Sequence, residues 1–176
     1  GGTGQLGAEI VRRLVAGGDR VTVFTRPGSD RSRLAELPVA YAEGDLLNEA
    51  DVKAAFAGRH IQYVIVAVRV EDGDPHFYAK FQPVLTASAQ AAGVKQLIHH
   101  GAVGAGRNAE KFSGLGWDKV PGLLERLQDQ GIGEDIVRVS GVPFTIIRNT
   151  RLYPDGTPAT GKAKLTQDDS VIDAMT

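Results

Sequence analysis

Three glycines at the start of the chain have a spacing that suits the binding of linked phosphates. Gly1, Gly4 and Gly7 stand in the run Gly-Gly-Thr-Gly-Gln-Leu-Gly, directly before an amphipathic segment. Glycine lets a backbone turn tightly and approach a pyrophosphate, and the N-terminus of a following helix carries a partial positive charge. Flexible linkers and helix ends also collect glycine, so the residues that follow must decide between the two interpretations.

Those residues predict a helix and then a strand. Apolar side chains recur at the spacing of one helical face: Ile10, Val11, Leu14 and Val15. Gly17 and Gly18 should end this helix, and the β-branched run at residues 21–25 predicts a strand. A glycine turn, a helix and a strand form the second half of a βαβ unit, which favours the phosphate-binding interpretation. The first strand of that unit would precede Gly1, so we expect the protein to begin earlier.

Helical and strand-like segments alternate along the rest of the chain. Helices are predicted at residues 32–37, 49–56, 81–92, around 123–127 and around 136–139, and strands at 39–42, 63–68, 97–100 and 144–147. Asn48 and Asp51 resemble an acidic capping box, and the apolar run at 63–68 suits the middle of a sheet. The alternation predicts an α/β fold: a Rossmann-type doubly wound parallel sheet with helices on both faces, in a single domain over residues 1–176.

Charge and composition narrow the class of partner. The formal net charge of −1 gives no broad attraction to nucleic acid or anionic lipid, and a sequence without cysteine holds no disulfide or zinc-thiolate site. His99 and His100 would point to opposite faces of a strand and cannot ligate one metal ion together. We expect a cytoplasmic protein that binds no metal and acts on a small-molecule substrate. Neither nucleic acid nor a membrane is expected as a partner, and a homodimer is compatible with the sequence.

Arg26 follows the predicted strand at 21–25, where dinucleotide sites distinguish their cofactors. NAD-selective sites usually place an acidic residue here to bind the ribose 2′-hydroxyl, whereas an arginine can pair with a 2′-phosphate. Arg26 therefore predicts NADPH. The alternative is an ordinary solvated loop arginine, which is the favoured interpretation for Arg31 and Arg33 in the same loop.

Five stretches of the chain resemble one known family. They are Gly-Gly-Thr-Gly-Gln-Leu-Gly at residues 1–7, Val-Phe-Thr-Arg at 23–26, Glu-Gly-Asp-Leu at 43–46, Ala-Ala-Gly-Val-Lys at 91–95 and Ser-Gly-Val-Pro-Phe-Thr-Ile-Ile-Arg at 140–148. These stretches look like the atypical short-chain dehydrogenase/reductases, and within them the NmrA-like, NAD(P)H-binding branch. That branch includes small quinone, biliverdin and flavin reductases and proteins thought only to sense NADP(H).

The resemblance implies a cofactor site along the carboxyl ends of the strands. Thr3, Gln5 and Leu6 would lie along the pyrophosphate with the three glycines. The other positions implied are Asp45 and Leu46 for the adenine, Ala67 and Val68 for the adenosine ribose, and Gly101, Ala102 and Val103 for the nicotinamide side. Asp45 is equally well explained as a turn residue that bonds its own backbone, and Ala67 and Val68 as strand core that offers the cofactor only its backbone.

The chain departs from the family at the catalytic residues. Classical members use a tyrosine, a lysine four residues later and a serine pair after the fifth strand, but no tyrosine here has that lysine. The resemblance puts Gly101-Ala102 in place of the serines, and Arg126 and Gln130 in place of the tyrosine and lysine. The catalytic residues are therefore unknown. For His99 and His100, packing is favoured over a role as an acid catalyst. For Trp117, packing is favoured over a role as one wall of the substrate site.

Two hypotheses from different classes remain. The first is an NADPH-dependent oxidoreductase that transfers hydride to a conjugated acceptor, such as a quinone, an enone or a flavin, which needs little help from an acid. The second is a non-catalytic, NADP(H)-binding regulator that senses redox state. Missing acid residues fit both, and the branch usually continues past the last residues of this sequence, so we expect more chain beyond Thr176.

Overall fold

The computed structural model describes residues 1–70, 74–112, 114, 116–149, 152, 156–158, 161 and 165–167. The strands in this part form two parallel sheets. One sheet pairs β1 (Thr22–Thr25) with β2 (Ala40–Glu43), and the other has the order β3-β4-β5, with β3 at Tyr63–Val66, β4 at Gln96–Ala102 and β5 at Phe144–Asn149. Parallel pairing with intervening helices confirms the α/β, Rossmann-like fold.

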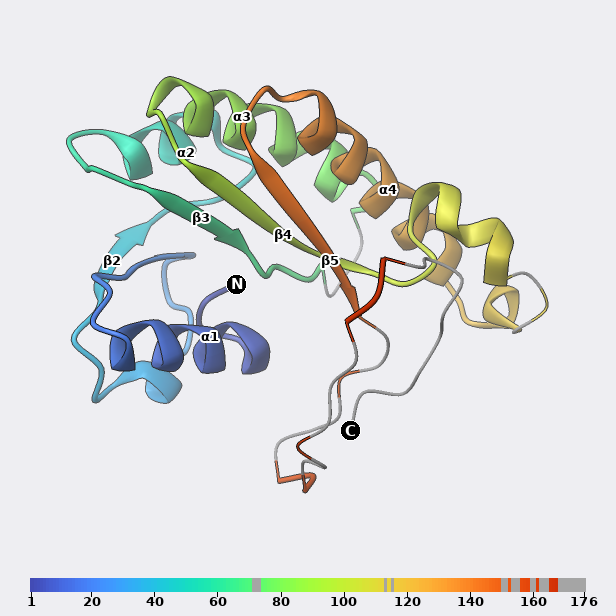
Figure 1. Cartoon of the computed structure of the whole chain (residues 1–176), viewed down its shortest axis with the longest axis horizontal. Helices are drawn as coiled ribbons and strands as arrows, with labels where there is room; N and C mark the ends of the chain where they lie inside the picture. Colours follow the sequence, from blue (N-terminus) through green and yellow to red (C-terminus); the bar gives the residue numbers. More distant parts are fainter. Residues whose placement is uncertain are drawn as a thin grey trace.

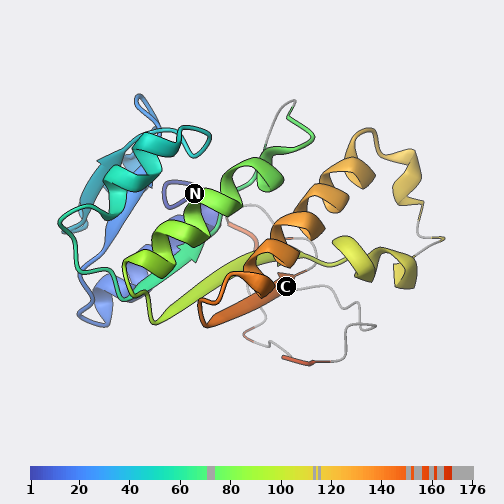
Figure 2. The ribbon, with the colours of Figure 1, turned by 90° about the horizontal axis from the view of Figure 1, so that it is seen from above.

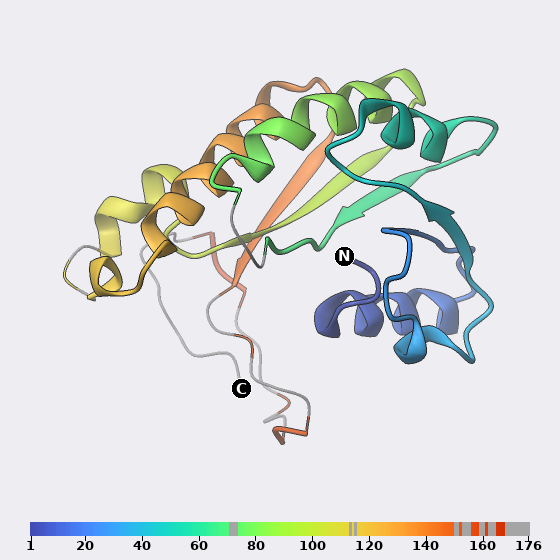
Figure 3. The ribbon, with the colours of Figure 1, turned by 180° about the vertical axis from the view of Figure 1, so that it is seen from behind.

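Helices cover both sides of the sheets. Figure 1 shows α1 (Gln5–Ala16) on one side, and α2 (Glu49–Phe56), α3 (Phe77–Ala91) and α4 (Leu123–Val139) on the other. The view from behind in Figure 3 gives the same arrangement, and Figure 2 shows α3 and α4 running side by side. Three short 3-10 turns complete the described elements: η1 (Ser32–Leu34), η2 (Gly106–Phe112) and η3 (Trp117–Lys119).

The two sheets are not hydrogen-bonded to each other, and the first residues of the chain reach both of them. A Cβ on Gly2 would lie 2.8 Å from a Val23 methyl group on β1, and a Cβ on Gly1 would lie 1.9 Å from the Ala67 carbonyl just beyond β3. Among the strands that the structure describes, β3 pairs with β4 alone, so the expected middle position of β3 is wrong there. A strand before Gly1, more chain beyond Thr176 and a single domain over residues 1–176 all stay predictions.

The apolar core has two parts, one for each sheet. The larger part packs α2, α3 and α4 onto β3 and β4 around the fully buried Phe81, Leu97 and Val137. The smaller part packs α1 and η1 onto β1 and is centred on Ala8, Val11, Val23 and Leu34. Of the apolar face predicted for the first helix, Val11 is buried and Val15 packs against this core, whereas Ile10 and Leu14 are only half-buried.

Helix α2 has the bounds predicted from its cap. The Asn48 side chain accepts hydrogen bonds from the backbone N–H groups of Ala50 and Asp51, as an N-cap residue should. Asp51 does not complete a capping box, because its carboxylate accepts instead from the backbone N–H of Asp45, at 2.9 Å. Asp51 therefore stabilises the loop before the helix rather than the helix cap.

Helix α4 is one helix where the sequence predicted two. Gly131 and Gly133 interrupt its apolar pattern, and each meets a neighbouring element closely. A Cβ on Gly131 would lie 2.3 Å from the Cα of Gly106 in η2, and a Cβ on Gly133 would lie 2.9 Å from the Tyr78 Cβ on α3. Packing rather than helix termination explains these two glycines. Helix α3 begins at Phe77, four residues earlier than predicted.

Candidate functional site

The glycine loop folds tightly at the start of α1. Gly4 is the N-cap, with extended backbone at φ −75° and ψ 173°, and its N–H donates to the Gly1 carbonyl at 3.2 Å. A Cβ on Gly7 would lie 2.0 Å from that same carbonyl. The first turn of α1 contains no acidic residue and no side chain caps it, so its partial positive charge is uncompensated there.

Thr3 stands on this loop, and Gln5 and Leu6 are the first two residues of α1. Thr3 and Leu6 are half-buried and Gln5 is exposed. Their backbone groups open the first turn of α1, which is the part of a helix that attracts anions. The structure therefore gathers the predicted pyrophosphate residues at one helix end.

Arg26 comes directly after β1, next to the glycine loop. Strand β1 adjoins that loop, because a Cβ on Gly2 would lie 2.8 Å from a Val23 methyl group. Arg31 is committed elsewhere, because it forms an ion pair with Glu43 and its guanidinium lies 4.3 Å from the ring centre of Tyr41. In the described residues the exposed Arg26 side chain makes no such pair, which fits the different roles predicted for these two arginines.

The loop after β2 presents Asp45 and Leu46. One Asp45 carboxylate oxygen accepts from the backbone N–H of Leu47 at 2.9 Å, so the turn role weighed for this residue is observed. The Asp45 side chain is exposed, whereas Leu46 is half-buried against the larger core. A second role for Asp45 at an adenine stays a prediction.

Ala67 and Val68 follow β3 and are held by a buried tyrosine. The Tyr78 hydroxyl donates to the Val68 carbonyl at 2.9 Å and accepts from the Gln130 amide at 3.2 Å. Burial raises the pKa of Tyr78 to about 12. The start of α3, the middle of α4 and the residues just after β3 are thereby joined through one hydroxyl group.

Asp129 adds a second link between α3 and α4. Its buried carboxylate accepts from the backbone N–H of Tyr78 at 2.6 Å and from that of Ala79 at 3.0 Å, in the first turn of α3. Sequence analysis missed this cap because the partners stand about fifty residues apart, and capping patterns are recognised only between near neighbours.

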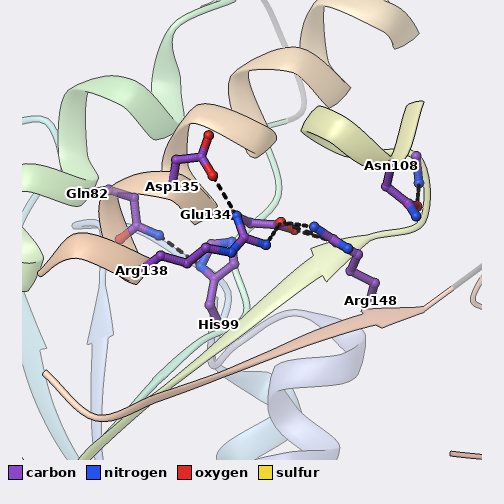
Figure 4. A network of polar contacts seen from close by, with 8 residues as sticks. Gln82, His99, Asn108, Glu134, Asp135, Arg138 and Arg148 are labelled. Carbon is purple, nitrogen blue, oxygen red and sulfur yellow. Dashed lines mark hydrogen bonds and ion pairs between the residues drawn. The ribbon is translucent and has the colours of Figure 1, made fainter. Parts of the chain in front are cut away.

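Gly101 and Ala102 end β4, and Gly101 lies against a buried carboxylate. A Cβ on Gly101 would lie 2.4 Å from Glu134 Oε1, and Glu134 is fully buried on α4. Glu134 accepts from Arg148 of β5 at 2.5 Å and from Arg138 at 3.1 Å (Figure 4). Gly101 is therefore needed by the fold, beside the role at the nicotinamide that was predicted for it.

The segment after β4 packs an aromatic group onto a glycine. Trp117 lies against Gly104, where a Cβ would be 2.1 Å from the indole ring, and its ring centre is 5.7 Å from that of Phe112. The Gly104 N–H donates to the buried Asn108 side chain at 2.8 Å, and the Val103 N–H donates to the Asn149 carbonyl at 3.2 Å. Packing is thus an observed role of Trp117.

The two adjacent histidines differ in their surroundings. His99 is fully buried beneath α3, with Nδ1 2.8 Å from the Gln82 amide nitrogen (Figure 4), and burial lowers its pKa to about 4. Burial also lowers the pKa of His100, which is half-buried. His99 is the residue packed under a helix that was expected from the strand pattern.

Comparison with known proteins decides the family. A family model described as NAD(P)H-binding matches residues 1–176. This chain belongs to the NAD(P)H-binding family. The resemblance found in the sequence motifs is confirmed, and so is the class of cofactor, a nicotinamide dinucleotide. In the part that the structure describes, no helix is both long and apolar enough to cross a bilayer.

Similar proteins include one curated relative and many solved structures. Sterol demethylase protein B of Methylococcus capsulatus is 34% identical over 127 residues, which make up 69% of this chain and 39% of that protein. ChuY, an anaerobillin reductase of Escherichia coli O157:H7, has a TM-score of 0.77 at 20% identity over 96% of this chain and 78% of its own. An NADPH-dependent quinone oxidoreductase of Escherichia coli, complexed with NADPH, has a TM-score of 0.59 at 22% identity over 85% of this chain and 47% of its own.

These likenesses differ in what they establish. The two structures share the fold of this chain at identities too low to transfer an activity. The chain spans about two fifths of the length of the curated relative and about half of the quinone oxidoreductase. The reaction, its substrate and any assembly are therefore matters for proposal.

Proposed function

We propose that this chain binds NADPH along the carboxyl ends of its strands and acts as an oxidoreductase on a conjugated small molecule, such as a quinone, an enone or a flavin. The family supports the cofactor class, and a structural neighbour is an NADPH-dependent quinone oxidoreductase. In this proposal the site consists of the residues named from the sequence, with the glycine loop at the pyrophosphate and Arg26 at the 2′-phosphate.

The observation that carries the proposal is the environment of Gly4. Gly1 and Gly7 must be glycine because a Cβ on either would overlap protein backbone. Gly4 needs no such room: its backbone is extended, and a Cβ would meet only the Gly1 carbonyl at 3.5 Å, an ordinary contact. A glycine that neither the fold nor its own conformation demands, at an uncapped helix N-terminus, fits the close approach of a phosphate group.

Bound NADPH supplies a hydride, and the residues of this chain position the two partners of the transfer. The acceptor takes up the hydride and a proton, and the proton comes from solvent. Tyr78 does not serve as its donor, because its hydroxyl already donates to the Val68 carbonyl and burial raises its pKa to about 12. A site of this kind suits acceptors whose conjugation stabilises the reduced form.

The experiment compares Gly4→Ala with Gly17→Ala. Both glycines have a similar negative φ, at opposite ends of α1. A methyl group on Gly4 should raise the dissociation constant of NADPH about tenfold or more, because it stands where the phosphate must approach. Gly17→Ala should leave NADPH affinity unchanged, with both constants measured by fluorescence titration. Equal affinity in the two variants would contradict the proposed site.

Turnover is tested separately from binding. NADPH oxidation is followed with a panel of quinones, enones and flavins, and activity with one of these classes is expected. Firm NADPH binding without turnover of any acceptor would reject the enzyme and leave the redox-sensing regulator.

A further inference from the structure

A small polar cluster lies where the first turn of α3 meets the middle of α4. It is built on the Tyr78 hydroxyl, which contacts the Val68 carbonyl and the Gln130 amide. In a parallel α/β fold the helices begin at the carboxyl edge of the sheet, which is the edge where ligands bind. The cluster therefore borders the proposed cofactor site.

Two arginines stand beside this cluster. Arg69 is the neighbour of Val68 in the chain, and Arg126 stands one turn before Gln130 on the same face of α4. Both positive charges reach the Tyr78 phenol: burial and then the charge of Asp129 raise its pKa, whereas the Gln130 hydrogen bond, Arg126 and Arg69 oppose that rise. Val68 and Gln130 both contact the Tyr78 hydroxyl, so their neighbours Arg69 and Arg126 stand near one point at the carboxyl edge.

The residues that the structure describes give these two charges no counter-ion. Among the described residues neither Arg69 nor Arg126 forms an ion pair or a side-chain hydrogen bond, whereas Arg31, Arg138 and Arg148 each pair with a glutamate. The acid beside the cluster is Asp129, and both of its oxygens accept backbone N–H groups of α3. Arg126 is half-buried, and a partly desolvated arginine without a partner is unusual in a surface that serves only solubility.

We propose that Arg69 and Arg126 together bind an anionic group, a carboxylate, on the conjugated acceptor. This inference rests on the proposed function and names the part of the acceptor that this chain recognises. A guanidinium matches a carboxylate with two parallel hydrogen bonds, so a pair of them selects and orients a ring that carries such a group. In classical members of the family a catalytic tyrosine positions the substrate carbonyl. Here the charges that hold the carboxylate would orient the acceptor instead.

The test uses two naphthoquinones that differ only in a carboxylate substituent. Arg126→Gln and Arg69→Gln should each raise the KM for the carboxylated ring about tenfold or more and leave the KM for the uncharged ring unchanged. The NADPH dissociation constant should not move in either variant, and Arg126→Lys should retain part of the discrimination. The matched control is Arg20→Gln, an exposed arginine before β1, at the opposite edge of the sheet.

Each of the other outcomes would contradict one part of the proposal. Equal changes in KM for both rings, or none, would overturn the role of the arginines, and a raised NADPH dissociation constant would assign them to a cofactor phosphate. If NADPH binds but neither ring is reduced, the proposed enzyme fails. Equilibrium dialysis with NADP⁺ present then still tests the arginines: tighter binding of the carboxylated ring, lost in Arg126→Gln, would support them, and equal binding of the two rings would overturn them.

Discussion

The glycine-loop half of the molecule and the α3–α4 half build their sites in different ways. In the first, from Gly1 to Glu43, the turn of the loop is closed by backbone contacts among Gly1, Gly4 and Gly7, and the ion pairs on α1 join residues three or four apart. In the second, side chains join distant segments, as Asp129 does with Tyr78 and Glu134 with Arg148. A local sequence pattern can therefore predict the first site, whereas the second exists only once the chain has folded.

The largest effect on folding is expected in the second half, at Glu134. This carboxylate is fully buried and paired with two arginines whose side chains are 21% and 38% exposed. Glu134→Gln removes the shared counter-charge, and we expect the free energy of unfolding to fall by about 3 kcal/mol in urea titration. Glu9→Ala on α1 removes an exposed carboxylate with two arginine partners and should cost less than about 1 kcal/mol. Similar losses in the two variants would contradict the comparison.

The free energy of unfolding is also expected to depend on pH, because His99 is a fully buried group that can take up a proton. Burial lowers the pKa of His99 from 6.5 to about 4, so the folded protein holds it neutral while the unfolded chain takes up a proton. Its contribution to stability should be complete above about pH 7, decline as pH falls from 6.5 to 4, and amount to about 3 kcal/mol at most. Unfolding free energies measured across this range should vary less in His99→Gln. His60→Gln, at an exposed position, should keep the wild-type profile.

The smallest effect on folding is expected in the first half, at Arg26. Replacing this arginine should instead change the preference of the protein between NADPH and NADH. Arg26→Asp removes the partner proposed for the 2′-phosphate and adds repulsion, so NADPH affinity should fall about tenfold or more relative to NADH. The free energy of unfolding should change by less than about 0.5 kcal/mol, since the side chain is exposed. Arg20→Asp serves as the control, and an unchanged ratio of the two affinities would refute the preference for NADPH.

The sequence predicted those elements whose signals are local. Helix α2 has the expected bounds because Asn48 caps it, and α1 ends at Gly17 as its glycine pair indicated. Helix α4 was predicted as two helices because its apolar residues gather around 123–127 and 136–139, and the stretch between them holds Gly131 and Gly133, which pack against η2 and α3. Strand β3 looked central because its residues are continuously apolar, but pairing partners are a property of the whole sheet.

The candidate site shows the same division. The residues of the glycine loop, Arg26 and Asp45 could be named from their places after predicted elements, and the structure puts each of them there. Tyr78 and Asp129 could not be named, because their partners are ten to fifty-two residues away along the chain. Arg126 and Gln130 were noted only as departures from a family pattern, and their position beside Tyr78 required the packing of α3 on α4.

The cap that Asp129 places on α3 also affects how a charged ligand meets the protein. A carboxylate at the first turn of a helix offsets the field that would otherwise draw anions there, and it remains in place as long as α3 and α4 stay packed. Helix α1 has no such acid. In the proposed complex we therefore expect a cofactor phosphate at the start of α1 in preference to that of α3.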